Sequence, residues 1–361
     1  MRTEKAKLNI LTSFLYQIVA TVCSLIAPRL ILSTFGSTYN GVIQSATQLL
    51  SMISLLTLGV AGATRVALYK TLAAGDIVAT SRVVKANRRY MNKVGIALIF
   101  YVIGLAAIYP LASYNDLSYF ENVGIVLIVS ISCFAEYFFG ITYATLLTAD
   151  QRSYVTSLTM TAVKILNCVV IYVLIRCGCS IYVVYFFATV AFALAPIFYC
   201  VYANRRYKLL HDCEPDDAAL EQKKAAAFHS LANIIHTNTD VALLTLFADA
   251  KVISVYSVYF MVTGKMRMIM QVFTGGMEAA FGNMWAKNEE DAFNRYFSAY
   301  EFVLYSFVSV VFGCAVCLIV PFVRLYTRGV TDINYINWTF AILITAAEGL
   351  YCIREPYLTL V

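Results

Sequence analysis

Eleven ionisable side chains lie inside stretches of otherwise apolar residues, and these groups could do the chemistry of the protein. The basic members are Arg29, Arg65, Lys164, Lys265, Arg267 and Arg354. The acidic members are Glu136, Asp240, Glu278, Glu348 and Glu355. A charge in an apolar layer costs about 2.5–3.5 kcal/mol on insertion scales, so such groups usually face a cavity or a partner. This number of charges indicates a hydrated cavity for a polar or charged passenger.

We divide these residues by the role that their charge permits. The candidate substrate-binding bases are Arg29, Arg65, Lys164 and Arg267. The candidates for ion coupling or for an internal charge pair are Glu136, Asp240, Glu278 and Glu348. Lys265 is set aside in favour of Arg267, because two residues two positions apart cannot share one face of a helix.

Each role has a plainer alternative. Arg29 and Arg65 lie near the ends of their apolar stretches, where a long side chain reaches the lipid headgroups. The Asp240 carboxylate could form a structural ion pair between helices as readily as it could bind a cation. Glu136 and Glu348 fit a proton or sodium relay less well than a charge pair.

The composition places these charges in a membrane. Of the 361 residues, 60% are hydrophobic and 13% are charged, against about 45–50% and about 25% in soluble proteins. A soluble protein of this length could not bury so much apolar surface. The sequence therefore predicts an all-α, polytopic membrane protein.

The apolar stretches set the number of membrane-spanning helices. A spanning helix needs about 20 mostly apolar residues. Ten segments of the sequence qualify, at residues 8–33, 41–69, 90–112, 121–148, 154–175, 179–203, 225–248, 252–284, 293–325 and 333–361.

The loops set the orientation. Loops on the side of the N-terminus carry most of the Lys and Arg residues, which predicts a cytoplasmic N-terminus by the positive-inside rule. The loop over residues 70–90 fits either an amphipathic helix on the membrane surface or a solvated connector. The charged loop over residues 204–224 separates two halves.

The two halves resemble each other. Glu136 and Glu348 lie 212 residues apart, Phe35 and Phe247 keep the same offset, and Pro110 and Pro321 nearly keep it. The offset predicts two pseudo-symmetric lobes of six helices each, related by an axis along the membrane normal as in some transporters. Residues 1–212 would form the N-terminal lobe, and residues 213–361 would form four helices of an incomplete C-terminal lobe. We expect about ten helices of twelve or more, with about 60 residues and two helices missing after the last residue; a genuine ten-helix protein is the alternative.

Signals of enzymes, cofactors and metals are missing from the sequence. It contains no phosphate-binding loop, no dinucleotide motif and no Ser/His/Asp arrangement in a suitable context. Cys314 and Cys317 have metal-ligand spacing, but they lie inside an apolar stretch without a second pair. We therefore expect no enzymatic activity, no cofactor and no metal site.

Three short segments carry a family resemblance that extends over the whole chain. They are residues 238–244 (NTDVALL) with Val-Tyr-Ser at 255–257, the loop at residues 35–41 (FGSTYNG), and residues 148–152 (TADQR). In these segments the chain resembles bacterial polysaccharide flippases of the O-antigen and teichoic-acid (Wzx-like) branch. That branch belongs to the multidrug/oligosaccharidyl-lipid/polysaccharide exporter superfamily. The superfamily also holds the lipid II flippases and the multidrug and toxin extrusion (MATE) antiporters.

The resemblance implies a function in cell-surface polysaccharide biosynthesis. The passenger would be an undecaprenyl-pyrophosphate-linked oligosaccharide, moved by alternating access of two lobes around a cationic cavity. In lipid II flippases, arginines of helices 1, 2 and 8 line the cavity, and Arg29, Arg65 and Arg267 fall on the same helices. The resemblance also implies a multi-pass protein of the bacterial cytoplasmic membrane, in contact with lipids, monomeric, without nucleic acid, and with room for contacts to other polysaccharide-assembly proteins.

Two other functions stay open. A proton- or sodium-coupled antiporter of drugs or organic cations would use Glu136, Asp240 and Glu348 as its cation site. A membrane glycosyltransferase or polysaccharide polymerase would need a large external loop with catalytic residues, whereas the loops on that side are short. Of these functions, we expect that of a flippase.

Overall fold

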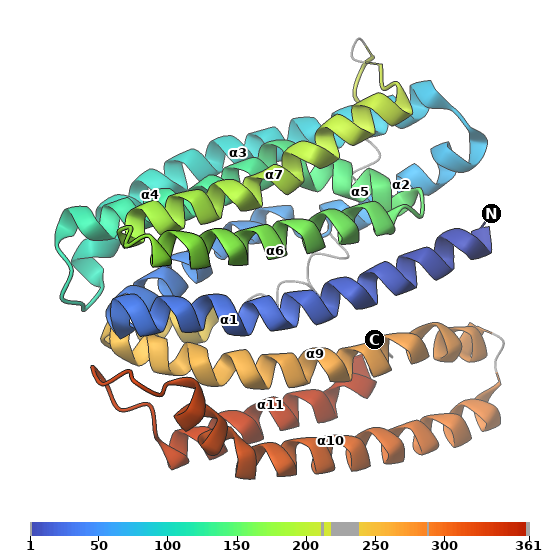
Figure 1. Cartoon of the computed structure of the whole chain (residues 1–361). Helices are drawn as coiled ribbons and strands as arrows, with labels where there is room; N and C mark the ends of the chain where they lie inside the picture. The colour runs from blue at the N-terminus through green and yellow to red at the C-terminus, as the bar shows by residue number, and fades with distance from the viewer. Residues whose placement is uncertain (1, 211–212, 218–237, 287–288, 359–361) are drawn as a thin grey trace. The chain divides into compact units, whose positions relative to one another are not determined.

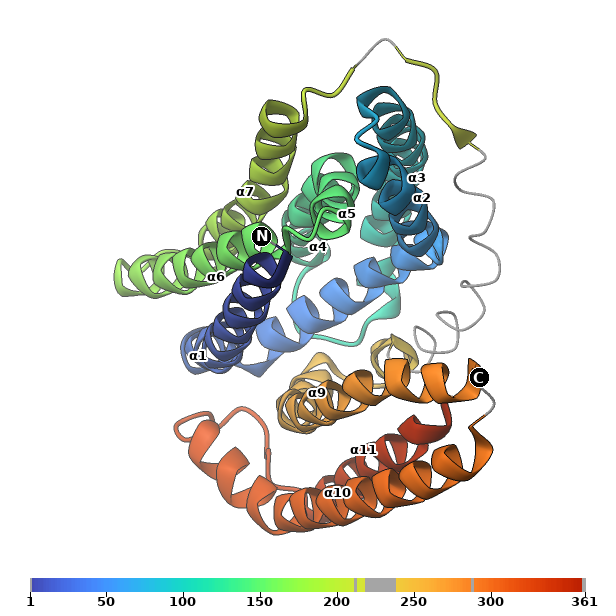
Figure 2. The same cartoon turned by 90° about the vertical axis from the view of Figure 1, so that its right-hand side faces the viewer.

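The structure is a computed structural model, and it describes residues 2–210, 213–217, 238–286 and 289–358. The described chain is built almost entirely of long helices (Figure 1, Figure 2). It divides into two compact units, Met1–Ile253 and Ser254–Val361. The first unit thus extends beyond the lobe boundary that the internal repeat predicts at residue 212, and that boundary stays a prediction.

Unit 1 contains the helices of the N-terminal half and one short helix over residues 238–247. Its named helices are α1 (Arg2–Ser51), α2 (Val60–Ala74), α3 (Ile77–Ala112), α4 (Tyr119–Ala135), α5 (Ile141–Ala149), α6 (Ser153–Arg176) and α7 (Ile181–Tyr207). A 3₁₀ helix, Met52–Thr57, follows α1, and a π-helical turn, Glu136–Gly140, joins α4 to α5.

Unit 2 contains three helices. They are α9 (Ala250–Ala286), whose first turn crosses the boundary between the units, α10 (Glu290–Tyr326) and α11 (Trp338–Leu358). The α10 and α11 helices pack against each other. A small apolar core around Met270, Phe312 and Cys352 joins α9 to both of them.

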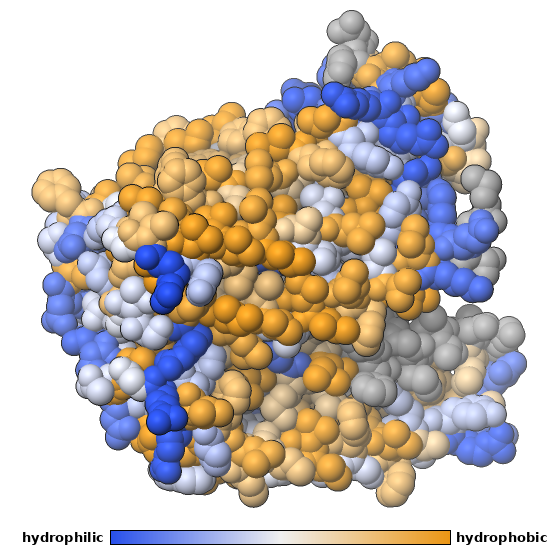
Figure 3. Space-filling view, in the orientation of Figure 1, coloured by the Kyte–Doolittle hydropathy of each residue, from blue (hydrophilic) through white to orange (hydrophobic). Residues whose placement is uncertain are grey.

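The predicted all-α, multi-pass membrane architecture is confirmed, and most of the predicted spans coincide with helices of the structure. Six stretches of the described chain are long and apolar enough to cross a membrane: Lys7–Thr57, Ile77–Ala112, Tyr119–Ala149, Ser153–Arg176, Ile181–Tyr207 and Asp291–Tyr326. The first of these holds two of the predicted spans, and α9 and α11 occupy two more. Most of the predicted span 225–248 lies outside the described residues. The chain is a multi-pass membrane protein, and Figure 3 shows apolar residues covering the middle of the unit 1 helices.

Two expectations about the segment 41–90 are wrong. The predicted span 41–69 is interrupted after Thr57, because Gly59 has a φ of 73° and ends the helical path before α2 starts. The loop 70–90 is neither a separate surface helix nor a connector. Instead, Gly75 caps the end of α2 in a left-handed conformation, and the Asp76 side chain accepts a hydrogen bond from the Ala79 N–H to start α3. The basic segment is the first half of α3.

Two apolar clusters hold unit 1 together. One joins the second half of α1 to α3, α4 and α7, and includes the fully buried residues Val42, Leu98 and Val126. The other joins α2, α3, α5 and α7, and includes Leu68, Tyr143 and Leu147. The helices that carry the candidate site residues of this unit are therefore fixed to one another at both ends.

The bend in α1 explains two glycines of the 35–41 segment. Gly36 has φ 86° and ψ 178°, a conformation that only glycine adopts without strain, and α1 changes direction there. A Cβ atom added to Gly41 would lie 1.7 Å from the carbonyl oxygen of Ala250. Ala250 therefore lies directly over Gly41, where its N–H donates a hydrogen bond to the Tyr114 carbonyl at 2.9 Å.

The helix boundaries extend the internal repeat beyond the matched residues. Helices α3 and α10 have 36 and 37 residues, and each contains a proline close to its C-terminal end. The kink at Gly36 corresponds, at the offset of 212, to the interruption between the helix 238–247 and α9. Both halves of the sequence thus contain an interruption between helices at corresponding positions, and the duplication itself stays a prediction.

We expect Gly41→Ala to destabilise the protein by about 3 kcal/mol or more, because the methyl group overlaps a backbone oxygen that cannot move away. The matched control is Gly62→Ala in α2, where an added Cβ meets no atom within 4 Å. It should raise stability by about 0.5–1 kcal/mol, the usual gain from replacing a helical glycine. Thermal unfolding of both variants in detergent measures the difference. Equal melting temperatures would contradict the contact between Gly41 and Ala250.

Candidate functional site

An enclosed charge pair lies in unit 2. Arg267 of α9 is 3.2 Å from the Glu348 carboxylate of α11, and their side chains are only 14% and 9% exposed. The guanidinium also lies beside two aromatic rings, 5.6 Å from the centre of Phe260 and 5.2 Å from that of Tyr351. The structure thus joins a residue predicted to bind substrate to one predicted to couple ions or form a pair.

The geometry of this pair leaves part of the arginine unused. Only Nη1 of Arg267 contacts the carboxylate, at 3.2 Å from Oε2 and 3.4 Å from Oε1. Its Nε and Nη2 atoms make no hydrogen bond to any residue that the structure describes. These two atoms form the edge with which arginine binds phosphate or carboxylate in a bidentate manner.

The three other predicted bases lie in unit 1 and are not brought together. Arg29 follows Pro28 in α1 and is half-buried, with its Nη1 atom enclosed. Arg65 lies on the exposed side of α2. Lys164 of α6 is half-buried and holds its ammonium group 4.7 Å from the centre of the Phe192 ring of α7. Whether any of them binds a passenger stays a prediction.

Glu136 occupies an unusual position in the backbone. It begins the π-helical turn, in which the Ile141 N–H bonds to the Glu136 carbonyl instead of to the next carbonyl along. An added Cβ at Gly140 would lie 3.2 Å from Pro196, so the π-helical turn packs closely against the proline of α7. The Glu136 side chain is exposed and makes no hydrogen bond or ion pair with the described residues. Turns of this kind are frequent at functional sites.

The two remaining acids of the predicted ion-coupling set are Asp240 and Glu278. Asp240 has an exposed side chain in the helix over residues 238–247. Its neighbour Asn238 is buried and accepts hydrogen bonds from Gln48 and from Ser51 of α1, the second at 2.8 Å. The side chain of Glu278 lies outside the described residues, so its predicted role is untested.

The segment 148–152 forms a structural junction. Asp150 accepts hydrogen bonds at Oδ2 from Arg152 Nε at 2.5 Å and from the Tyr207 hydroxyl at 2.7 Å. Lys5 lies 3.5 Å from its Oδ1 atom. Burial by itself raises the pKa of Asp150, but these hydrogen bonds and charges outweigh it, so the pKa lies below its usual value. The segment therefore ties the start of α1 and the end of α7 to the turn between α5 and α6.

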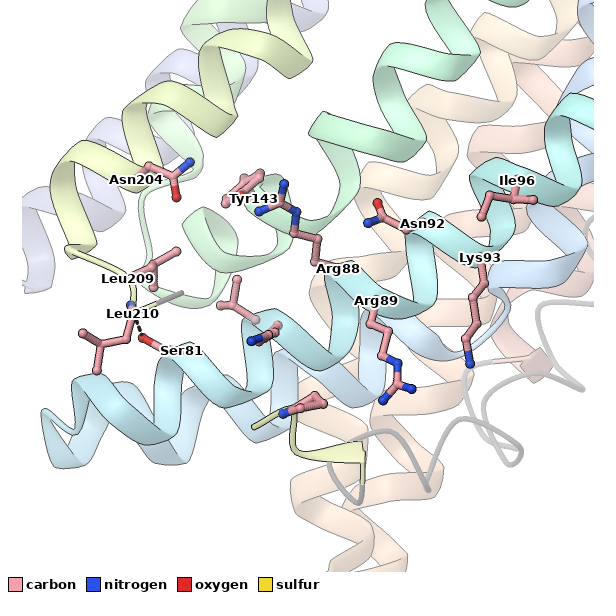
Figure 4. A pocket seen from close by; sticks show the side chains of 13 residues that line it. Ser81, Arg88, Arg89, Asn92, Lys93, Ile96, Tyr143, Asn204, Leu209 and Leu210 are labelled. Carbon is pink, nitrogen blue, oxygen red and sulfur yellow. Dashed lines mark hydrogen bonds between the residues drawn. The ribbon is translucent and has the colours of Figure 1, made fainter. Parts of the chain in front are cut away.

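A basic pocket in unit 1 was missed by the sequence reasoning. It is a cavity of about 430 Å³, and α3 contributes Lys85, Arg88, Arg89 and Lys93 to its lining (Figure 4). From the sequence, these residues are assigned only to a loop whose positive charge sets the orientation of the chain in the membrane. Their spacing of three and four positions, typical of one helix face, could have revealed the cluster once the helix was recognised.

We expect Asp150→Asn to destabilise the protein by about 1–3 kcal/mol, because it removes a carboxylate that accepts charge-assisted hydrogen bonds. Since the folded pKa is below the unfolded value of 3.8, the stabilisation is complete above that value and is lost as the pH falls through the folded pKa. Thermal unfolding at neutral and at acidic pH measures both effects. Asp291→Asn, at an exposed position, is the control. A variant that unfolds like the wild type at neutral pH would contradict the junction.

We expect the Arg267–Glu348 pair to behave non-additively. Arg267→Gln and Glu348→Gln should each cost about 3–5 kcal/mol, because each leaves a buried charge without its partner. The double variant should cost less than the sum of the two. The control is the exposed pair of Lys251 and Asp116, at 2.8 Å, whose coupling should stay below about 1 kcal/mol. Double-variant cycles by thermal unfolding measure both couplings, and additive effects at Arg267 and Glu348 would rule out their pairing.

The fold is similar to that of solved transporters. An inward-facing multidrug-resistance MATE family transporter of the MOP superfamily matches with a TM-score of 0.68 and 14% identity, over 96% of this chain and 84% of that one. An outward-facing structure of such a transporter gives 0.60 and 13%, over 98% and 82%. A MATE protein in a bent conformation gives 0.57 and 15%, over 98% and 81%.

The other two comparisons do not add a family. No family model and no curated protein matches the sequence. At 13–15% identity the structural similarity establishes the fold alone. The chain therefore has the helical fold of the MATE transporters of the MOP superfamily.

Proposed function

We propose that the protein moves a lipid-linked oligosaccharide with a pyrophosphate head across the membrane by alternating access. The fold is shared with transporters solved in inward-facing and outward-facing conformations, which supports a transport cycle of that kind. The proposal assigns the chain no catalytic step. The passenger is inferred from the charges at membrane depth.

The observation that carries the proposal is the arrangement around Arg267. In unit 2, the carboxylate of Glu348 is already neutralised by an arginine, so an organic cation would meet a positive charge there. A pyrophosphate, in contrast, could bind the Nε and Nη2 edge that Glu348 leaves unused. The rings of Phe260 and Tyr351 hold the guanidinium in place for either partner.

The same pair offers a link between the passenger and an ion gradient. Protonation of Glu348 would remove the negative charge that competes with the pyrophosphate for Arg267. Release of the passenger would then restore the pair and expel the proton. Binding of the passenger and the state of Glu348 are thereby coupled through one guanidinium group.

The proposal includes the cellular setting implied by the resemblance. The protein would act as a monomer in the bacterial cytoplasmic membrane, with its N-terminus in the cytoplasm. Residues 1–212 and 213–361 would then belong to the two lobes that rock against each other. Arg29 and Lys164, both half-buried in unit 1, would contribute positive charge for the same passenger. Arg65 has the weakest case, because its side chain is exposed on α2.

One observation favours a second function, cation-coupled export of drugs. Glu136 presents an exposed carboxylate, without an ion pair in the described chain, at the π-helical turn of a membrane span. A carboxylate in that setting suits a proton or a sodium ion better than an anionic passenger. Glu136 would then be the principal cation site, and Arg267 with Glu348 a structural pair.

Reconstituted vesicles can separate the two functions. A fluorescent undecaprenyl-pyrophosphate oligosaccharide in the membrane reports flipping through its protection from an impermeant quencher, and ethidium uptake driven by a proton gradient reports drug transport. We expect flipping by the wild type, and a reduction of about tenfold or more in Arg267→Gln from the loss of charge-assisted hydrogen bonds.

The controls identify the cause of a loss. Arg176→Gln removes an arginine at the exposed C-terminal end of α6 and should leave flipping unchanged. Arg267→Lys keeps the charge without the bidentate edge and should restore only part of the rate. Ethidium transport without flipping, abolished by Glu136→Gln, would replace the proposal with the antiporter.

A further inference from the structure

The basic pocket of unit 1 is enclosed by three parts of the chain. The first half of α3 forms one wall, Tyr143 of α5 and Asn204 of α7 lie opposite it, and Leu209, Leu210 and Pro215 close another side (Figure 4). The residues of the described chain that line the cavity include four bases and no Asp or Glu. Its volume of about 430 Å³ is within the range of small-ligand sites.

The four bases face the cavity from a single stripe of α3. Arg88 and Arg89 follow Lys85 after three and four residues, and Lys93 follows Arg89 after four, which places the bases on one broad face of the helix. Like charges at three- and four-residue intervals destabilise a helix. An anion in the cavity would turn this repulsion into attraction.

Two of the bases have no counter-charge in the described chain. Arg88 is half-buried and points toward Tyr143, yet neither it nor Lys93 forms a hydrogen bond or an ion pair with the described residues (Figure 4). Tyr143 is only 2% exposed, so its side chain belongs to the wall of the cavity. The Asn204 amide oxygen is buried and accepts no hydrogen bond from the described residues. Rotation of that amide by half a turn would direct its NH₂ group to an anion.

The counter-charge of Arg89 is weak. Asp217 lies 3.7 Å from Arg89, and the two side chains are 68% and 58% exposed, a setting in which an ion pair contributes little. The backbone of this segment is held more firmly, because Arg82 donates from Nε to the Glu214 carbonyl and accepts the Asp216 N–H at its own carbonyl, both at 3.2 Å. A phosphate could displace Asp217 from Arg89 while the segment stays in place over the cavity.

The length of α3 places the pocket at the membrane surface. A helix of 36 residues is about 54 Å long, whereas the hydrocarbon core is about 30 Å thick. Residues 94–112 are apolar and long enough to cross that core, so the basic half of α3 extends into the headgroup region. Phosphate groups of lipids and of soluble compounds are both within reach there.

We propose that this pocket is a binding site for a phosphate-bearing anion, held by Arg88 and Lys93 with Lys85 and Arg89 in support. Arginine binds phosphate oxygens through its planar edge, and lysine adds a point charge. Leu209 and Leu210 of the covering segment give the cavity an apolar side suited to the glycerol or acyl part of a lipid. This site is independent of the passenger assigned above.

The test compares two double variants that remove the same charge. Arg88→Gln/Lys93→Gln empties the pocket of its two unpaired bases, and Arg205→Gln/Arg206→Gln removes two exposed arginines from the end of α7, neither of which lines the cavity. Titration of the full chain in phosphatidylcholine nanodiscs with inorganic pyrophosphate measures soluble anions. Native mass spectrometry with phosphatidylglycerol measures lipid.

The expected result is binding by the wild type, weakened about tenfold or more in the pocket variant and less than about twofold in the control. Loss of the pyrophosphate signal identifies a soluble phosphate ligand, and loss of retained phosphatidylglycerol alone identifies a lipid headgroup. Arg88→Lys should recover part of the affinity, which separates recognition from misfolding. The proposal is overturned if the wild type binds neither probe, or if both double variants lose binding equally.

Discussion

The cost of a charge in the hydrocarbon core governs the arrangement of this protein. A charged side chain there costs about 2.5–3.5 kcal/mol on insertion scales, so it requires compensation from its surroundings. Arg267 is compensated by Glu348 and two aromatic rings, and Lys164 by the ring of Phe192. Arg354 lies 4.8 Å from the centre of the Tyr351 ring. Glu136 has no such partner among the described residues.

The helices and the interruption near Gly36 were predictable from the sequence, whereas the break at Gly59 and the π-helical turn at Glu136 were not. Apolar runs predict spans because backbone groups in lipid must be satisfied within a helix. The π-helical turn at Glu136 packs against another helix, through the close contact of Gly140 with Pro196. A pattern read along one chain contains no information about those neighbours.

The contacts within the candidate site could likewise not be predicted from the sequence. The sequence identifies Arg267 and Glu348 as charges at membrane depth but assigns them to different roles, since 81 residues separate them. Their distance of 3.2 Å makes them one unit, in which the role of each depends on the other. The pocket on α3 was missed for a related reason. Its lysines and arginines match the positive-inside rule, and that rule requires no particular position for any of them.

Basic residues that set the orientation of a membrane protein can therefore also form a binding site. The positive-inside rule acts on the number of basic residues near a membrane end, so selection for orientation alone would leave them scattered and solvated. In α3 four of them share one helix face and line a cavity, opposite the buried side chain of Tyr143. Keeping like charges together opposes helix stability, and the attraction of anionic lipids to each base, about 1 kcal/mol at the surface, is available to scattered residues as well. The clustering thus requires a cause beyond orientation, and a phosphate group that several bases bind together is such a cause.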